Sequence, residues 1–217
     1  MKEGAKIEAL ADLDLIKKGE RLPVMEVFYT IQGEGRNAGA PAIFIRLAGC
    51  DVGCHWCDVK ESWIATDHKV YSIQELRVEI SQYPCKNIVI TGGEPLMYNL
   101  DVLCSSLRED GCLLWMETSG AYELTGEWDW VCLSPKKTKL PVQSVLNHAH
   151  ELKCIVFNQS DFNFAEEHAG KVGTNCELFL QVELSVKEKR LPSLIQYVKD
   201  YPKWKISTQT HKYLDIP

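Results

Sequence analysis

Short apolar runs recur along the chain, and each is followed at once by glycine or polar residues. The runs are apolar almost throughout and do not alternate with polar residues, which is typical of strands buried on both faces of a parallel sheet. The predicted strands are residues 24–35, with a glycine-rich turn at the end, and 42–47, 87–90, 112–116, 129–133, 152–157 and 178–184.

Amphipathic helical segments separate several of these runs, at residues 72–83, 99–110 and 190–200. Ser72 and Glu75 have the spacing of a capping box at the start of the first helix. This alternation of strands and helices predicts an α/β protein. The strands are too few for a closed eight-stranded barrel, so we expect a partial, open parallel β/α barrel of about six strands.

One domain is expected, because the chain contains no internal repeat, low-complexity segment or linker. We place this domain at residues 23–217. Residues 1–22 form an N-terminal extension, in which a weak amphipathic pattern predicts a peripheral helix.

Glycine and polar motifs follow the predicted strands. A cysteine loop comes after residues 42–47, and the motifs TGGEP (91–95), ETSG (117–120) and SPK (134–136) follow later strands. In parallel α/β folds, ligands gather at the carboxyl ends of the strands. We therefore expect all these motifs, and the glycine-rich turn that ends the first strand, at one edge of the sheet.

The cysteine loop, GCDVGCHWC, contains Cys50, Cys54 and Cys57 in a C-x3-C-x2-C spacing. Three thiolates suit three irons of a 4Fe–4S cluster and leave the fourth iron open to a small chelating molecule. A zinc site usually has four ligands with paired cysteines, and the remaining cysteines here are scattered singly. The cluster is therefore favoured over zinc, and a disulfide framework is less favoured than either.

Composition limits the kinds of partner that this chain can bind. The chain has 217 residues, of which 45% are hydrophobic and 25% are charged, and its net charge is -6. An acidic balance argues against nucleic acid as the main partner. No apolar run is long enough to cross a bilayer, so no membrane partner is expected. Six of the nine cysteines are scattered singly outside the loop, and without a signal peptide they indicate a reducing compartment, so we expect the cytoplasm.

The cysteine loop, with Trp56 before its last cysteine, and the TGGEP motif together resemble the radical S-adenosylmethionine (SAM) enzymes. The resemblance implies a 4Fe–4S cluster held by Cys50, Cys54 and Cys57, with SAM on the open iron. It assigns the methionyl amino group to Gly92, Gly93 and Glu94 and the ribose and adenosine to other residues. The implied SAM-binding residues are Trp56, Asp58, Gly92, Gly93, Glu94, Glu117, Thr118, Ser134, Pro135, Lys136 and Gln181.

The segments FYTIQGEG, RLAGC, TGGEP, ETSG, SPK and TQTHKYLDIP resemble the 7-carboxy-7-deazaguanine synthases, over nearly the whole chain from about residue 24. This implies a lyase of queuosine and other deazapurine biosynthesis. It contracts the ring of 6-carboxy-5,6,7,8-tetrahydropterin, with loss of ammonia, to 7-carboxy-7-deazaguanine. No side chain is expected to act as a nucleophile or general base. The implied substrate-binding residues are Ile31, Gln32, Gly33, Glu34, Arg46, Thr91, His211 and Pro217, the last through its carboxylate.

The same resemblance implies an electron donor such as flavodoxin or ferredoxin, a homodimer, and Mg²⁺ beside the substrate. At the position where the family commonly has a threonine ligand for Mg²⁺, this chain has Val59, which offers no side-chain oxygen. Two other functions are compatible with the cysteine loop. A glycyl-radical enzyme activase predicts an open face for a protein substrate, and a non-catalytic iron–sulfur carrier or sensor predicts no SAM cleavage.

Overall fold

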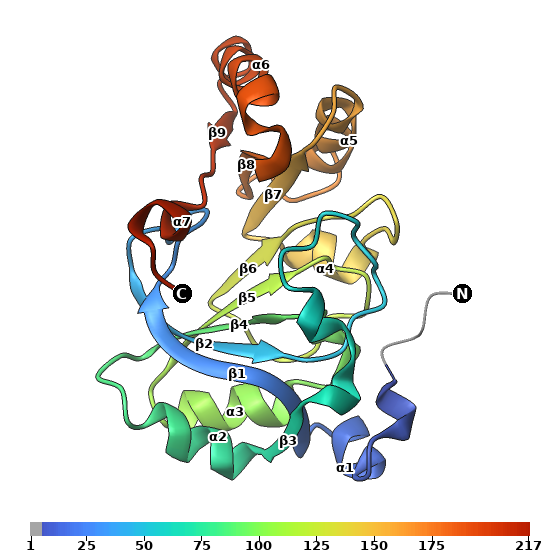
Figure 1. The fold of residues 1–217 in the computed structure, drawn as a ribbon, viewed down its shortest axis with the longest axis vertical. Coiled ribbons are helices and arrows are strands. Elements are labelled where there is room, and N and C mark those ends of the chain that lie inside the picture. Colours follow the sequence, from blue (N-terminus) through green and yellow to red (C-terminus); the bar gives the residue numbers. More distant parts are fainter. Residues whose placement is uncertain (1–5) are drawn as a thin grey trace.

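The computed structural model describes residues 6–217, in which strands and helices alternate over most of the length (Figure 1). The strands are β1 (Arg21–Ile31), β2 (Pro41–Leu47), β3 (Lys69–Ser72), β4 (Asn87–Gly92), β5 (Leu113–Thr118), β6 (Trp130–Leu133), β7 (Glu151–Val156), β8 (Glu177–Val182) and β9 (Trp204–Ile206). The α-helices are α1 (Leu13–Lys17), α2 (Ile73–Ile80), α3 (Asp101–Glu109), α4 (Gln143–His148), α5 (Ser160–Ala169), α6 (Lys187–Asp200) and α7 (Thr210–Leu214). The 3-10 helices are η1 (Ile7–Ala9), η2 (Lys60–Trp63), η3 (Ala65–Asp67), η4 (Pro95–Met97) and η5 (Leu184–Val186).

The strands of residues 6–217 form one sheet in the order β3-β1-β2-β4-β5-β6-β7-β8-β9. From β2 to β9 every neighbouring pair is parallel, whereas β1 is antiparallel to both β2 and β3. Because β3 and β9 are the two edges, the described strands do not close on one another. The prediction of an open, partial β/α barrel is confirmed.

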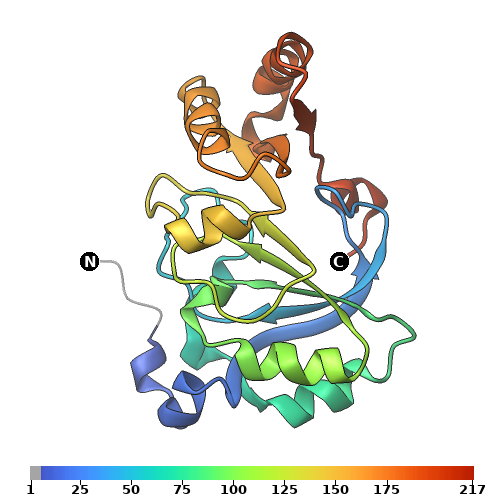
Figure 2. The same ribbon diagram turned by 180° about the vertical axis from the view of Figure 1, so that it is seen from behind.

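The middle of the sheet carries the main apolar core. Ile88 and Ile90 on β4 and Leu114 on β5 are fully buried, and each such side chain stabilises the fold by about 1.5–3 kcal/mol. Helices α2 and α3 pack side by side against this part of the molecule (Figures 1 and 2). The predicted capping box at the start of α2 is confirmed, since Ser72 and Glu75 each accept a hydrogen bond from the backbone N–H of the other.

The predicted N-terminal extension contains η1 and α1, and its residues 1–5 lie outside the described part. The helix is short, but it is anchored to the sheet, because the Ile16 side chain is 2% exposed and belongs to the main core. No helix within residues 6–217 has the length and apolar character needed to cross a membrane.

The direction of β1 corrects one expectation. TGGEP, ETSG and SPK follow the carboxyl ends of parallel strands, as predicted. The turn after β1 does not share their edge, because Ile31 at the end of β1 pairs with Pro41 at the start of β2. Residues 32–40 therefore approach the barrel from the opposite edge.

Candidate active site

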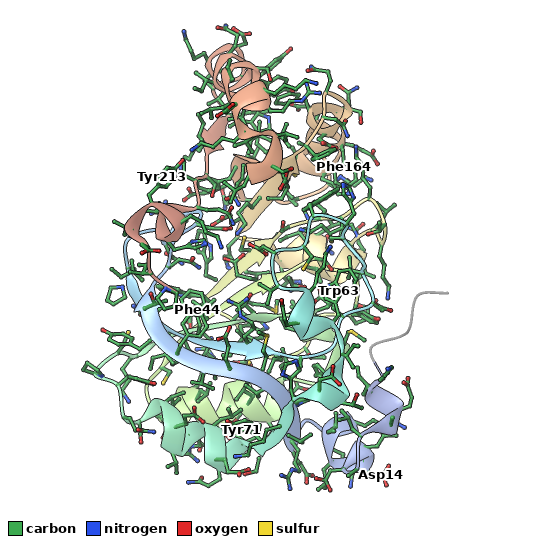
Figure 3. All side chains as sticks on the ribbon, viewed as in Figure 1. Asp14, Phe44, Trp63, Tyr71, Phe164 and Tyr213 are labelled. Carbon is green, nitrogen blue, oxygen red and sulfur yellow. The ribbon has the colours of Figure 1, made fainter. Side chains whose placement is uncertain are left out.

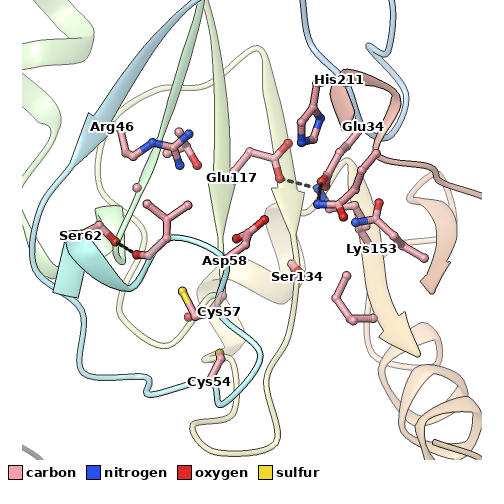
Figure 4. A pocket seen from close by; sticks show the side chains of 18 of the residues that line it. Glu34, Arg46, Cys54, Cys57, Asp58, Ser62, Glu117, Ser134, Lys153 and His211 are labelled. Carbon is pink, nitrogen blue, oxygen red and sulfur yellow. Dashed lines mark hydrogen bonds and ion pairs between the residues drawn. The ribbon is translucent and has the colours of Figure 1, made fainter. Parts of the chain in front are cut away.

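A cavity of about 520 Å³ lies on the inner side of the curved sheet and extends from the cysteine loop to the C-terminal segment. Figure 4 shows Cys54 and Cys57 on one side of this cavity and Glu34, Lys153 and His211 on the other. Every predicted site residue lines the cavity except Pro135, which is buried next to two that do. These lining residues are Ile31, Gln32, Gly33, Glu34, Arg46, Cys50, Cys54, Trp56, Cys57, Asp58, Thr91, Gly92, Gly93, Glu94, Glu117, Thr118, Ser134, Lys136, Gln181, His211 and Pro217.

The cysteine loop presents Cys50, Cys54 and Cys57 to the cavity as half-buried thiols that form no disulfide. Its start is fixed by backbone hydrogen bonds from Gly49 and Cys50 to the segment that contains η2. Within residues 6–217 no three metal-binding side chains converge on a single point. The fit to a 4Fe–4S cluster therefore rests on the donor set, which is three thiols of one loop facing one cavity.

Trp63 at the end of η2 (Figure 3) directs its indole toward this loop. Its Nε1–H donates to the Cys57 Sγ over 3.3 Å. On the other side of the loop, the Trp56 ring stacks on Phe157 with ring centroids 5.9 Å apart. One cysteine ligand of the expected cluster thus has a hydrogen-bond donor, and the loop has an aromatic support.

The two glycines of TGGEP are required by close backbone packing. A Cβ on Gly92, whose φ is +127°, would lie 2.1 Å from the Leu47 carbonyl oxygen, and one on Gly93 would lie 2.2 Å from the Gly49 oxygen. The backbone N–H groups of Gly93 and Glu94 donate to these same two oxygens. The TGGEP turn is therefore bonded directly to the start of the cysteine loop.

The Glu94 carboxylate is 1% exposed and points toward the next strand end. One of its oxygens accepts from the Leu96 N–H and the Thr118 hydroxyl, and the other accepts from the N–H and the hydroxyl of Ser119. Four accepted hydrogen bonds make this carboxylate a brace between TGGEP and ETSG. Its predicted contact with the amino group of SAM stays a prediction.

SPK provides a second polar group on the SAM side. The Lys136 ammonium donates to the carbonyl oxygen and the hydroxyl of Ser134, at 2.7 and 2.6 Å. This internal bonding holds the lysine against its own loop, at the rim of the cavity.

The wall opposite the cysteines is formed by charged groups from three segments. The Lys153 ammonium on β7 lies 2.6 Å from Glu34 and 2.8 Å from Glu117, and the lysine side chain is 5% exposed. Burial raises the pKa of Glu34, but Lys153 and the Gln209 amide outweigh it and bring this pKa down to about 2. For Glu117 burial dominates, so its pKa is raised above the ordinary value.

Lys153 and Gln209 were not identified from the sequence. Lys153 stands in the apolar run LKCIVF, and a lone cation in such a strand is the signal that could have pointed to it. Gln209 had no such signal, since it lies in a polar segment whose position depends on the tertiary fold.

Arg46 reaches the cavity from β2. Its Nε–H donates to Glu26 on the adjacent strand over 2.6 Å, and the guanidinium lies 5.6 Å from the centre of the Phe28 ring. Thr91 on β4 pairs with Arg46 in the sheet register, so the two predicted substrate residues are neighbours. Arg46 lines the cavity, whereas its partner Glu26 does not.

Residues 207–217 follow the edge strand β9 and reach the other side of the open sheet, where α7 lies beside the end of β1 (Figure 1). The Thr210 N–H donates to the Gly33 carbonyl, and the Thr30 hydroxyl donates to the Pro217 carbonyl. A Cβ on Gly33 would lie 2.2 Å from the His211 ring, so the turn and α7 are in close contact. The structure thus brings Gly33, His211 and Pro217, which the resemblance assigned to the substrate, close together.

The position proposed for Mg²⁺ has few available oxygens. Val59 lines the cavity, and its carbonyl oxygen already accepts from the N–H and the hydroxyl of Ser62. Asp58 is the neighbouring carboxylate that faces the cavity. These residues do not form a side-chain Mg²⁺ site of the usual kind.

Comparisons with known proteins agree with this geometry. The model of the radical SAM superfamily matches residues 44–150. A protein of Flavobacterium psychrophilum named 7-carboxy-7-deazaguanine synthase is 55% identical, over 93% of this chain and 96% of its own length. A Synechocystis protein of the same name is 44% identical over 89% and 93%. The crystal structure of QueE from Escherichia coli superposes with a TM-score of 0.80 at 31% identity and covers 93% of this chain and 99% of that one.

Proposed function

The chain belongs to the 7-carboxy-7-deazaguanine synthases of the radical SAM superfamily, and from this premise we propose how its residues divide the work. The enzyme is a lyase that contracts 6-carboxy-5,6,7,8-tetrahydropterin to 7-carboxy-7-deazaguanine with release of ammonia, a reaction of queuosine biosynthesis. The observation that carries the assignment of residues is that the cysteine loop and a charged wall face each other across one cavity.

On the cluster side, Cys50, Cys54 and Cys57 hold a 4Fe–4S cluster. The cluster and SAM, when bound, supply the radical chemistry. Backbone groups of Gly92 and Gly93 receive the methionyl amino group of SAM, and Glu94 keeps this turn in place through its bonds to ETSG. The remaining SAM contacts come from Trp56, Asp58, Thr118, Ser134, Pro135, Lys136 and Gln181.

On the substrate side, Arg46 pairs with the carboxylate of the pterin, because a guanidinium matches that planar group. Gln32 and Glu34 bind the amino-pyrimidinone edge of the ring. Further contacts come from Ile31, Gly33, Thr91, His211 and Pro217. The task of these residues is to bind and orient the ring and to exclude water.

We assign no step to Mg²⁺, because Val59 stands at the position of the family's threonine ligand and offers no side-chain oxygen. We propose that the enzyme works as a homodimer in the cytoplasm and takes electrons from a flavodoxin or ferredoxin. Support for a reducing compartment comes from the nine cysteines of this chain, which form no disulfide in the structure.

The test is anaerobic incubation of the cluster-loaded enzyme with SAM, a reductant and the carboxypterin. Formation of 7-carboxy-7-deazaguanine together with 5′-deoxyadenosine and methionine is the expected result. Cleavage of SAM that is unaffected by the pterin, with no deazaguanine, would contradict the assignment. A glycyl-radical activase fits less well, because the relatives that match most of this chain are named 7-carboxy-7-deazaguanine synthase.

A further inference from the structure

Lys153 is a buried cation to which the functions above give no role. Its side chain is 5% exposed, and its ammonium touches two carboxylates from distant parts of the chain, Glu34 after β1 and Glu117 near the end of β5. A buried charge is tolerated only where it is paired and hydrogen-bonded. The three groups therefore have to be considered as one unit.

Each carboxylate is fixed at both of its oxygens. The second oxygen of Glu34 accepts from the Gln209 amide at 2.8 Å, and the second oxygen of Glu117 accepts from the Gln32 amide at 3.2 Å. An ionised carboxylate has about four acceptor positions, so each of the two can still accept from a ligand. Both line the cavity, and Figure 4 shows them converging on Lys153 from two sides.

We propose that Lys153 is a positioning residue that holds Glu34 and Glu117 as a pair of acceptors, which together select a ring edge carrying adjacent N–H donors. The inference rests on the proposed function, in which that edge is the amino-pyrimidinone side of the pterin. It adds a second carboxylate to the ring-recognition site and places Glu117 on the substrate side of the cavity.

The charge of Lys153 is what makes the pair possible. Two carboxylates bonded to one nitrogen are close together, and without the cation they would share a proton. A protonated carboxyl group carries an O–H, which donates a hydrogen bond and therefore cannot accept one from an N–H group of the ring at that position. The titratable groups that face this unit are Cys132 on β6, Glu151 on β7 and His211 on α7.

Loss of the cation is therefore expected to impair recognition of the ring more than the radical chemistry. In Lys153→Met, KM for the pterin should rise about tenfold or more, with a smaller change in kcat and in the affinity for SAM. The KM of this variant should also fall as pH rises, because Glu34 and Glu117 then lose the proton that they share. Lys153→Arg should restore much of the wild-type KM, and Lys171→Met, at an exposed pair with Glu167 on α5, is the matched control.

A ligand pair provides a test that does not depend on Lys153→Met folding. 6-Carboxypterin and 6-carboxylumazine differ at position 2, where the amino donor of the first is a carbonyl acceptor in the second. As inhibitors of the wild-type enzyme, the pterin should bind at least tenfold more tightly. In Glu117→Gln, which keeps the Lys153–Glu34 pair, this preference should shrink several-fold.

Two results would overturn the inference while the enzyme still makes deazaguanine. One is an unchanged preference between the two inhibitors in Glu117→Gln. The other is a Lys153→Met enzyme whose kcat falls while its KM for the pterin and its affinity for SAM stay at the wild-type values, as a purely structural loss of active enzyme predicts. A wild-type protein that makes no deazaguanine would instead contradict the proposed function, so the two failures are distinguishable.

Discussion

Glu94→Gln tests whether this carboxylate braces the site or contacts SAM. In the structure each carboxylate oxygen accepts one backbone N–H, from Leu96 at 3.0 Å and from Ser119 at 2.8 Å, besides a hydroxyl. Glutamine replaces one oxygen with an NH₂ group, which then faces a buried backbone donor. Leaving such a donor unsatisfied costs about 1–3 kcal/mol.

The expected change is a lower melting temperature without a matching loss of SAM affinity. For a chain of this length, a loss of about 1–3 kcal/mol corresponds to roughly 2–12 °C in Tm. Thermal unfolding followed by circular dichroism measures Tm. The control is Glu188→Gln, which makes the same substitution at an exposed glutamate on α6. SAM affinity is measured separately by equilibrium dialysis on the cluster-loaded proteins.

The opposite pattern would refute the reasoning. If the Tm of Glu94→Gln equals that of the control while SAM binds tenfold more weakly, then Glu94 is a direct ligand of SAM. The brace described above would then be a feature of the ligand-free site alone.

Three further predictions concern other parts of the cavity. Arg46→Ala should raise KM for the pterin by about tenfold to a hundredfold, as the loss of a charged hydrogen bond of about 1.5–3 kcal/mol implies, with normal absorbance of the cluster; an unchanged KM would exclude the carboxylate contact. Gly33→Ala should push His211 away and weaken pterin binding with little effect on SAM binding. Pterin binding at the wild-type level would show that the turn can adjust to the added methyl group without cost. Trp63→Phe removes the N–H that favours the more negative, reduced state of the cluster at Cys57, so its midpoint potential should fall by on the order of 40 mV if that bond is worth about 1 kcal/mol. A redox titration followed by electron paramagnetic resonance measures this potential, and an unchanged value would show that the bond does not distinguish the two redox states.

Much of the architecture follows from local sequence. Strands β4 and β5 are short apolar runs that end in glycine or polar motifs, and the capping box of α2 needs only Ser72 and Glu75. The motif residues could be assigned to one cavity because parallel strands bring their carboxyl ends to a common edge.

The parts that escaped prediction depend on tertiary contacts. A strand's apolar pattern does not show its direction, so the antiparallel pairing of β1 was not foreseen. β3 and β9 are short and mainly exposed or half-buried, and α5 buries the polar Asp161 and His168 among its apolar positions, which obscures its periodicity. The pairing of Lys153 with Glu34 joins residues 119 positions apart, which no local pattern records.

The segment that reaches across the open side of the barrel, residues 207–217, has a consequence for hydrogen exchange. Gln209 and Glu34, which join across that opening, are 175 positions apart, and the segment is held by individual contacts and one short helix with no ladder of strand pairs. Such a segment can detach in a local opening that leaves the sheet intact. Amides of α7 should therefore exchange with deuterium sooner than those of β4, and substrate that bridges the two sides should slow the exchange of α7 selectively.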